Sequence, residues 1–250
     1  MISRAVLITG CSSGIGRASA ERLAAAGWTV YASARRLEAV AGLVGCRPLE
    51  LDVTDERSMR AAVELVEREE GAVGVLVNNA GYSQSGAVEG VSPDEARRQF
   101  ETNVFGLARL TQLVLPGMRA QRWGRIVNVS SMGGELTFPG GGWYHASKHA
   151  VEALSDALRF EVAGFGIDVV VIQPGLIRTG FAEAAVGSIE VGDGPYARFD
   201  AAVGAATAGA YDGAFARVLG GGPEAVAKAV ERAVTAKRPR TRYRVTPSAR

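Results

Sequence analysis

The chain has little of several residue types, and each shortage narrows what it can be. Its 250 residues include only two cysteines and two histidines, and its formal net charge is +2. Two cysteines cannot build a disulfide framework, and Cys11 and Cys46 have no metal-ligand spacing, which favours a reducing, cytoplasmic compartment. A charge of +2 is too small to indicate a nucleic-acid-binding surface. No run of about 18 apolar residues occurs, so no membrane span is predicted.

Glycine and apolar residues are abundant instead, with 32 glycines and 47% hydrophobic residues. Short apolar runs alternate with longer helix-like stretches, which predicts a Rossmann-type α/β fold. We expect a doubly wound parallel sheet with helices on both faces, in a single domain that spans residues 1–250. The predicted strands are 5–8, 29–33, 48–51, 73–77, 125–129 and 168–172, and the predicted helices include 15–26, 56–68 and 93–115, the last ending before Pro116.

The first predicted strand leads directly into a glycine-rich turn, Thr9-Gly10-Cys11-Ser12-Ser13-Gly14-Ile15-Gly16. Backbone N–H groups of such a turn and the N-terminus of the next helix can bind a pyrophosphate, and glycine lets the phosphates approach. The spacing is G-x-x-x-G-x-G rather than the G-x-G-x-x-G of many dinucleotide folds. Such a turn can also simply connect two elements, but its position after the first strand predicts nucleotide binding.

The residues after the second predicted strand indicate whether NADP or NAD is the preferred cofactor. An acidic residue there binds the ribose 2′-hydroxyl of NAD, whereas an arginine accepts the 2′-phosphate of NADP. This chain has Ala34 in place of the acid, followed by Arg35 and Arg36. The pattern favours NADP as the cofactor over NAD, although two arginines can also begin a solvated helix face.

Tyr144 and Lys148, in the motif Y-H-A-S-K, are four residues apart and are predicted to lie on one helix face. Such pairs are common on solvated helices, but this pair also places an ammonium beside a phenol. A phenol has a pKa of about 10; a cation about 4 Å away, at an effective dielectric constant of about 20, supplies the roughly 4 kcal/mol that lowers it to about 7. We therefore expect Lys148 to lower the pKa of Tyr144 and make it a general acid/base.

Two further features have more than one interpretation. Asp52, after the third predicted strand, could place a carboxylate near an adenine amino group, while Thr54 could cap the next helix. His145 and His149 are four residues apart, a spacing that can ligate a metal on one helix face. No third ligand is evident, so packing or a surface position is favoured and no metal site is predicted.

The motifs follow one another in the order typical of one family. After the Thr9–Gly16 turn come Asn78-Asn79-Ala80-Gly81, Asn103, Ser130-Ser131, the Tyr144 and Lys148 pair, and Pro174-Gly175 with Thr179. Over roughly residues 4 to 180 the chain resembles the short-chain dehydrogenases/reductases. Within them it looks most like the hydroxysteroid and retinol dehydrogenase-like members.

The resemblance implies a catalytic set of Asn103, Ser131, Tyr144 and Lys148. Tyr144 would exchange a proton with the substrate oxygen, and Ser131 would hold that oxygen. Lys148 would also bind the nicotinamide ribose, and Asn103 would order a water molecule. Local chemistry does not separate Ser131 from Ser130, so that choice rests on the family spacing. The cofactor-binding residues implied are Gly10, Ser12, Ser13, Gly14, Ile15, Gly16, Arg35, Asp52, Val53, Asn79, Ala80, Gly81, Tyr144, Lys148, Pro174, Gly175, Ile177 and Thr179.

The expected activity is that of an NADP-dependent oxidoreductase that transfers hydride between NADP(H) and a ketone or alcohol. A reductase of 3-oxoacyl thioesters shares all of these motifs, and a non-catalytic NADP-binding regulator is the alternative from another class. Because family members are usually dimers or tetramers, a homodimer or homotetramer is expected, with residues 104–115 and 151–160 as the interface.

Substrate choice is expected to depend on residues 138–143 and on a long segment at about 176–222, which resembles a mobile lid. Its aromatic residues favour a bulky apolar carbonyl substrate, although they could equally pack on the body of the protein. In the basic tail, the alternation at 241–245 predicts a final strand with its charged residues facing outward. The lid aromatics are Phe181, Tyr196, Phe199, Tyr211 and Phe215.

Overall fold

The computed structural model describes residues 2–189, 192–212 and 218–249. Within them, seven strands form one sheet in the order β3-β2-β1-β4-β5-β6-β7, and every neighbouring pair is parallel. The doubly wound α/β fold predicted from the sequence is confirmed. The strands are β1 (Ala5–Ile8), β2 (Thr29–Ala34), β3 (Cys46–Glu50), β4 (Val75–Asn78), β5 (Gly124–Val129), β6 (Ile167–Pro174) and β7 (Arg242–Val245).

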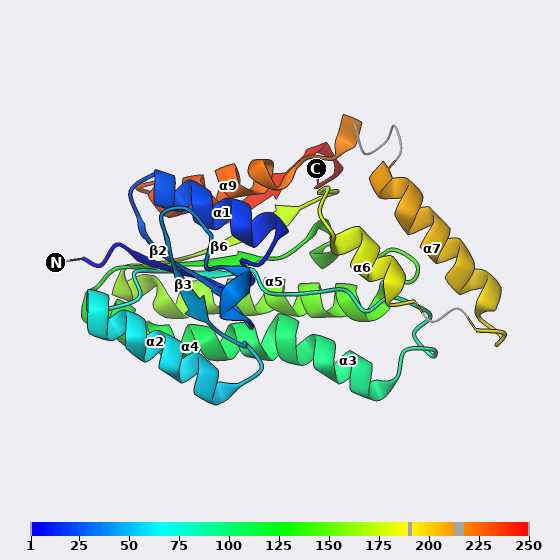
Figure 1. The fold of residues 1–250 in the computed structure, drawn as a ribbon, viewed down its shortest axis with the longest axis horizontal. Coiled ribbons are helices and arrows are strands. Elements are labelled where there is room, and N and C mark those ends of the chain that lie inside the picture. Colours follow the sequence, from blue (N-terminus) through cyan, green and yellow to red (C-terminus); the bar gives the residue numbers. More distant parts are fainter. Residues whose placement is uncertain (1, 190–191, 213–217, 250) are drawn as a thin grey trace.

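Helices cover both faces of the sheet (Figure 1). On one face lie α1 (Gly14–Ala25) and α9 (Pro223–Thr235); on the other lie α2 (Glu56–Glu70), α4 (Leu107–Ala120) and α5 (Gly142–Val162). Successive strand residues point to opposite faces. Val6 and Ile8 accordingly pack into the core beneath α1 and α9, whereas Ala5 and Leu7 pack into the core beneath α2 and α4. The short apolar runs read from the sequence are therefore strands buried on both faces.

The long helix predicted from residue 93 onward is interrupted and also extends further than expected. Ser92 caps α3 (Pro93–Phe100) in a capping box with Glu95, as its sequence predicts. A π-helical turn, Glu101–Gly106, then joins α3 to α4. The expected stop before Pro116 is wrong, because α4 continues to Ala120. Pro116 lies on the exposed side, where water can reach the carbonyl that its missing N–H leaves free.

The segment at 176–222, predicted from the sequence to be a lid, contains two helices in its described part. It contains α6 (Phe181–Gly187) and α7 (Ala197–Asp212), which lie beside each other at the edge of the molecule (Figure 1). At the start of α7, Asp200 is buried, and its Oδ1 accepts a hydrogen bond from the Ala87 N–H at 2.9 Å. Phe215 lies outside the described residues.

No helix in the described part of the chain is both long and apolar enough to span a bilayer. Both cysteines carry free thiols.

The final strand forms as predicted, and Arg244 is exposed as expected, where it pairs with Glu135. Arg242 instead is only partly exposed and forms ion pairs with Glu152 and Asp156 of α5. The alternation of residues correctly indicated a strand. It could not reveal that α5 places two carboxylates beside Arg242.

The turn between β1 and α1 is packed too closely for any side chain at Gly16. A Cβ there would overlap the Gly10 carbonyl oxygen and lie 2.5 Å from Asn79 Nδ2. Gly16 is therefore required by a close approach between the first turn of α1 and the loop after β4. This contact sets the position of the helix N-terminus relative to the edge of the sheet.

We predict that Gly16→Ala lowers the free energy of unfolding by at least about 2 kcal/mol, because the added methyl meets main-chain atoms that cannot move aside. Gly164→Ala is the matched control, since a Cβ at Gly164 would have no atom within 4 Å. Urea unfolding of both variants measures the difference. Equal stability of the two variants would contradict the packing described.

Candidate active site

The candidate site lies where the chain order across the sheet reverses, between β1 and β4. The carboxyl ends of these strands meet there, and in open α/β sheets this crevice is where ligands bind. The Thr9 hydroxyl accepts hydrogen bonds from the main-chain N–H groups of Asn79 and Ala80, at 3.0 and 2.9 Å. In return, Asn79 Nδ2 donates to the carbonyls of Thr9 and Gly10. The glycine-rich turn is thereby held against the end of β4.

The N-terminus of α1 is open to an anion. Ser13 occupies the N-cap position, but its side chain makes no capping hydrogen bond, and the first turn of α1 contains no acidic residue. Ser12 and Ser13 are exposed. Gly14 has a φ of +54°, and a Cβ there would lie 3.3 Å from Thr179 Cγ2. The free N–H groups, the helix dipole and the absence of side chains fit the pyrophosphate of a dinucleotide.

The residues predicted for the adenosine end lie beside this turn. Arg35 and Arg36 follow β2 and are exposed. Asp52 Oδ1 accepts hydrogen bonds from the Thr54 N–H at 2.9 Å and the Thr54 hydroxyl at 2.7 Å. Thr54 is not the helix cap that the sequence allowed. Asp55 occupies that position and accepts from the Arg57 N–H.

Several of the residues predicted to bind the cofactor also contact other parts of the protein. Val53 and Ile177 are buried, and Ile15 packs against the core beneath α1. A Cβ on Gly175 would overlap the Ser248 hydroxyl, so Gly175 is needed for contact with the C-terminal segment. Pro174 ends β6 and places this segment beside the site.

Tyr144 and Lys148 occupy one face of α5, as the four-residue spacing predicts. Lys148 is buried, with 6% of its surface exposed. Its Nζ donates to the Val129 carbonyl at 2.9 Å and lies 5.8 Å from the centroid of the Tyr144 ring. Burial lowers the pKa of Lys148 to about 8, and the carboxylate of Glu152 partly opposes that decrease.

The pKa of Tyr144 shifts in the direction opposite to the sequence-based expectation. Burial raises the pKa of Tyr144, a hydrogen bond with Ser131 lowers it, and nearby Tyr211 raises it. The expectation was wrong because it counted only the charge of Lys148 and not the burial of the phenol. Lys148 points its ammonium at the Val129 carbonyl. Tyr144 is held in its protonated form, which can donate a proton.

The structure separates the two serines after β5. Ser131 begins the short 3-10 helix η3 (Met132–Gly134), and its Oγ accepts from the Gly133 N–H at 3.1 Å. Its side chain also lies close enough to Tyr144 to lower the pKa of the phenol. Ser130 is buried, and its hydroxyl has no hydrogen-bond partner among the described residues. Only Ser131 therefore lies beside the phenol.

Asn103 lies in the π-helical turn and is 1% exposed. Its amide donates to the Tyr82 carbonyl at 2.9 Å and to the Ser147 hydroxyl at 3.1 Å, and its Oδ1 accepts from the Tyr82 N–H. A Cβ on Gly81 would lie 3.0 Å from Asn103 Oδ1 and 3.6 Å from Lys148 Nζ. Asn103 and Lys148 thus border the same space, on either side of Gly81.

Aromatic residues of the 176–222 segment contact the catalytic helix. The Phe181 ring lies 5.5 Å from the Tyr144 ring, centroid to centroid. Tyr211 of α7 contributes to raising the pKa of the Tyr144 hydroxyl. Tyr196 and Phe199 lie farther out, each more than one third exposed. At least part of this segment therefore covers the phenol rather than only packing on the body.

His145 and His149 are placed by packing and by helix contacts. His145 lies against the rings of Phe138 and Tyr144, and His149 Nδ1 is 2.9 Å from the His145 carbonyl. No cluster of three or more metal-ligating side chains occurs in the part of the chain described.

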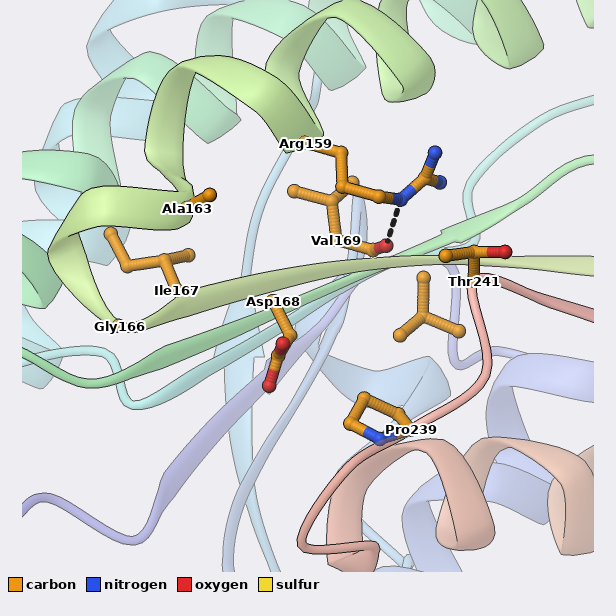
Figure 2. Close-up of a pocket in the computed structure, with 9 residues that line it drawn as sticks. Arg159, Ala163, Gly166, Ile167, Asp168, Val169, Pro239 and Thr241 are labelled. Carbon is orange, nitrogen blue, oxygen red and sulfur yellow. Dashed lines mark hydrogen bonds between the residues drawn. The ribbon is translucent and has the colours of Figure 1, made fainter.

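A separate hollow of about 220 Å³ lies at the other edge of the sheet (Figure 2). Figure 2 shows Arg159 Nε donating to the Val169 carbonyl, at 3.0 Å, with Asp168 and Pro239 nearby. These residues lie at the C-terminal end of α5, at the amino end of β6 and in the turn before β7. None of the candidate catalytic residues lines this hollow, so it is not part of the site.

Sequence reasoning missed residues that position the site. Thr9 binds the main chain of the loop after β4. Ser147 accepts a hydrogen bond from Asn103 and donates one to the Tyr144 carbonyl. Glu152 raises the pKa of Lys148. Glu152 could have been found, because it follows Lys148 by the same four residues that separate Lys148 from Tyr144. Thr9 and Ser147 act through main-chain partners, which no residue pattern reveals.

Comparison with known proteins agrees with this geometry. The sequence profile of a family described as "short chain dehydrogenase" matches residues 4–188. A 3-ketodihydrosphingosine reductase of Bacteroides thetaiotaomicron is 44% identical over 178 residues, which are 71% of this chain and 65% of that relative. This chain thus spans just under two thirds of that relative's length. An NADPH-dependent 3-dehydrocapnine reductase of Ornithobacterium rhinotracheale is 38% identical over 264 residues, covering 98% of this chain and 88% of the relative.

The fold is also similar to that of solved structures. A short-chain dehydrogenase from Streptomyces avermitilis superimposes with a TM-score of 0.83 at 37% sequence identity, over 99% of this chain and 89% of the other. The similarity therefore extends through the sheet and beyond the residues matched by the family profile.

Proposed function

The chain belongs to the short-chain dehydrogenase/reductase family, and from that premise we propose that it is an NADPH-dependent reductase of an apolar ketone. The observation that carries the proposal is the position of the Tyr144 hydroxyl. It lies close enough to the Ser131 side chain for that group to lower its pKa, lies on the helix face of Lys148, and its ring packs against Phe181. Tyr144 can therefore donate a proton to a substrate oxygen that Ser131 binds, and Phe181 provides an apolar surface beside them.

In the proposed reaction the bound dinucleotide supplies the hydride, and the protein supplies orientation and the proton. Tyr144 donates its hydroxyl proton to the carbonyl oxygen as that oxygen becomes negative. Tyr144 is protonated at neutral pH and so carries the proton that this step needs. Ser131 donates a hydrogen bond to the same oxygen. Lys148 carries positive charge next to the phenolate that remains, and Asn103 orders a water through which the proton is replaced.

The proposed cofactor site runs along the carboxyl ends of the strands. The N-terminus of α1 binds the pyrophosphate, and Arg35 binds the ribose 2′-phosphate, since no acidic residue follows β2. Asp52 reaches the adenine through the carboxylate oxygen that Thr54 leaves free. The other cofactor residues named from the sequence border the two riboses and the nicotinamide.

The proposed substrate is a ketone with a bulky or long apolar body. Apolar side chains are exposed in segments that precede α5: Val88 is 62% exposed, Leu136 53% and Phe138 43%. Phe181 adds an aromatic ring against Tyr144. Two relatives are named as reductases of 3-ketodihydrosphingosine and 3-dehydrocapnine, and we propose a substrate of similar apolar character. A 3-oxoacyl thioester is the second substrate to assay.

We also propose that the protein forms a homodimer or homotetramer through α4 and α5. Phe160 of α5 is 84% exposed, Phe105 beside α4 is 55% exposed and Leu154 of α5 is 43% exposed. Large apolar side chains gathered on neighbouring helices indicate an interface. Light scattering gives the mass in solution, and a monomer at micromolar concentration would contradict this assembly.

The function is tested by NADPH oxidation with ketones of increasing apolar size, steroids and 3-oxoacyl thioesters. We predict turnover of a bulky apolar ketone by the wild-type protein, and a loss of kcat of about 10²- to 10⁴-fold in Tyr144→Phe, because the proton donor is removed. NADPH binding should change less than about threefold, since the ring remains.

Tyr196→Phe is the matched control for this substitution. It also removes one hydroxyl from the same region, one that bonds to Glu89 on the surface, and it should keep wild-type turnover. If NADPH binds to the wild-type protein but no ketone or thioester in the series is reduced, the proposed activity is wrong.

Cofactor choice is tested by Arg35→Ala. Loss of a charge-assisted contact with the 2′-phosphate should raise the KM for NADPH about tenfold or more and leave the KM for NADH within about twofold. Arg17→Ala, which removes an exposed arginine of α1 paired with Glu21, serves as the control. Equal changes for both cofactors in Arg35→Ala would exclude a role in NADP selection.

A further inference from the structure

Glu152 continues the face of α5 that carries Tyr144 and Lys148. It follows Lys148 by four residues, one helical turn, and is only 7% exposed. Its Oε1 accepts a hydrogen bond from Gln173 Nε2 at 2.9 Å, and its Oε2 accepts from Arg242 Nε at 3.0 Å. Both carboxylate oxygens are thus bound, to β6 and to β7. The proposed chemistry gives this residue no role.

Glu152 also contacts the turn that follows Ser131. A Cβ on Gly134 would lie 3.0 Å from Glu152 Cγ and 3.2 Å from its Oε1. Gly134 is the last residue of η3, and Ser131 is its N-cap. The turn that positions Ser131 therefore lies directly on the Glu152 side chain.

The charges around Glu152 are paired. Arg242 also binds Asp156, at 2.6 Å, and Arg159 pairs with Asp156. Gln173 Nε2 donates to Glu135 Oε1 at 2.9 Å as well as to Glu152. On the other side of Lys148, the π-helical turn and the Gly81 loop present uncharged polar groups. Several titratable or charged groups lie around Glu152 and Lys148. They are Tyr144, Asp156 and Arg159 on α5, Glu135 after η3, Arg242 and Arg244 on β7, and Tyr82 beside Asn103.

We propose that Glu152 is a positioning residue of the active site, a buried carboxylate that lies one turn along α5 from Lys148 and is held by Gln173 of β6 and Arg242 of β7. The effect on turnover rests on the proposed reductase function; the effect on Lys148 does not. In this account the C-terminal strand is part of the catalytic machinery, because its Arg242 holds the Glu152 carboxylate in place.

The expected effect on Lys148 has a definite sign. Burial lowers the pKa of Lys148 and the Glu152 charge raises it. Without that charge the pKa falls further, so the ammonium is lost at a lower pH. If turnover requires protonated Lys148, the pH at which kcat declines on the alkaline side decreases by the same amount.

The titration of Lys148 can be measured directly, because the chain contains only three lysines, Lys148, Lys228 and Lys237. Protein labelled with ¹³C at the lysine ε-carbon gives three NMR signals, and Lys148→Met identifies the one from Lys148. We expect the Lys148 midpoint to fall by about one pH unit in Glu152→Gln. The glutamine can still accept from Arg242 and can donate to Gln173 Oε1, which has no partner among the described residues.

Two further variants distinguish an effect of charge on the Lys148 midpoint from a general loss of packing. Arg242→Gln removes a positive charge next to Glu152, so the Lys148 midpoint should rise by about half a unit. Glu161→Gln, at an exposed position of α5, should leave it unchanged. Equal decreases in Glu152→Gln and Arg242→Gln would indicate general loss of packing and would overturn the proposal. An unchanged midpoint in Glu152→Gln also overturns it.

Circular dichroism establishes that each variant is folded. If Glu152→Gln does not fold, Arg242→Gln carries the test, and a midpoint that does not rise overturns the proposal. The kcat profile against pH is then measured with a ketone that the wild-type protein reduces. Absence of any turnover in the wild-type protein would refute the reductase function, while the NMR midpoints would still decide the role of Glu152.

Discussion

The site depends on keeping one ammonium group in a nearly water-free position. Lys148 is buried at the carboxyl edge of the sheet, where Val129 offers a carbonyl oxygen and Glu152 a negative charge. Burial of a cation costs free energy unless such groups accompany it. The fold provides both groups: Val129 ends β5 at this edge, and Glu152 lies on α5, which packs against the sheet. Removing either partner would favour the neutral amine and so change the chemistry of the neighbouring phenol.

The two ends of the chain contribute to the same site through different interactions. The turn after β1 is joined to β4 by Thr9 and Asn79, which leaves the first turn of α1 free to bind an anion. The last strand contributes Arg242, whose ion pairs hold α5 against β7. Between them, the π-helical turn places Asn103 next to Gly81 and Lys148. Such interruptions of α-helices are frequent at functional sites, and here the interruption makes the Tyr82 main chain a hydrogen-bond partner.

The sequence predicted the strands and the shared helix face of Tyr144 and Lys148 well, because both follow from simple periods. Apolar runs such as Ala5–Ile8 indicate buried strands, and a spacing of four places Tyr144 and Lys148 on one face. It failed where the outcome depends on neighbours distant in the chain. Pro116 is accommodated because it faces solvent. Arg242 of β7 turns toward α5 because Glu152 and Asp156 lie there. The pKa of Tyr144 rises because the phenol is buried. Neither carboxylate is near Arg242 in sequence.

The central claim is that Tyr144 and the groups around it protonate a ketone that has received a hydride. The most direct measurement uses NADPH carrying deuterium at the transferable C4 position, a bulky apolar ketone, and mass spectrometry of the alcohol formed. The account predicts that the deuterium appears on the carbinol carbon of the alcohol produced by the wild-type protein, and that the hydroxyl proton comes from solvent through Tyr144. An alcohol without deuterium, or no alcohol from a protein that binds NADPH, would contradict it.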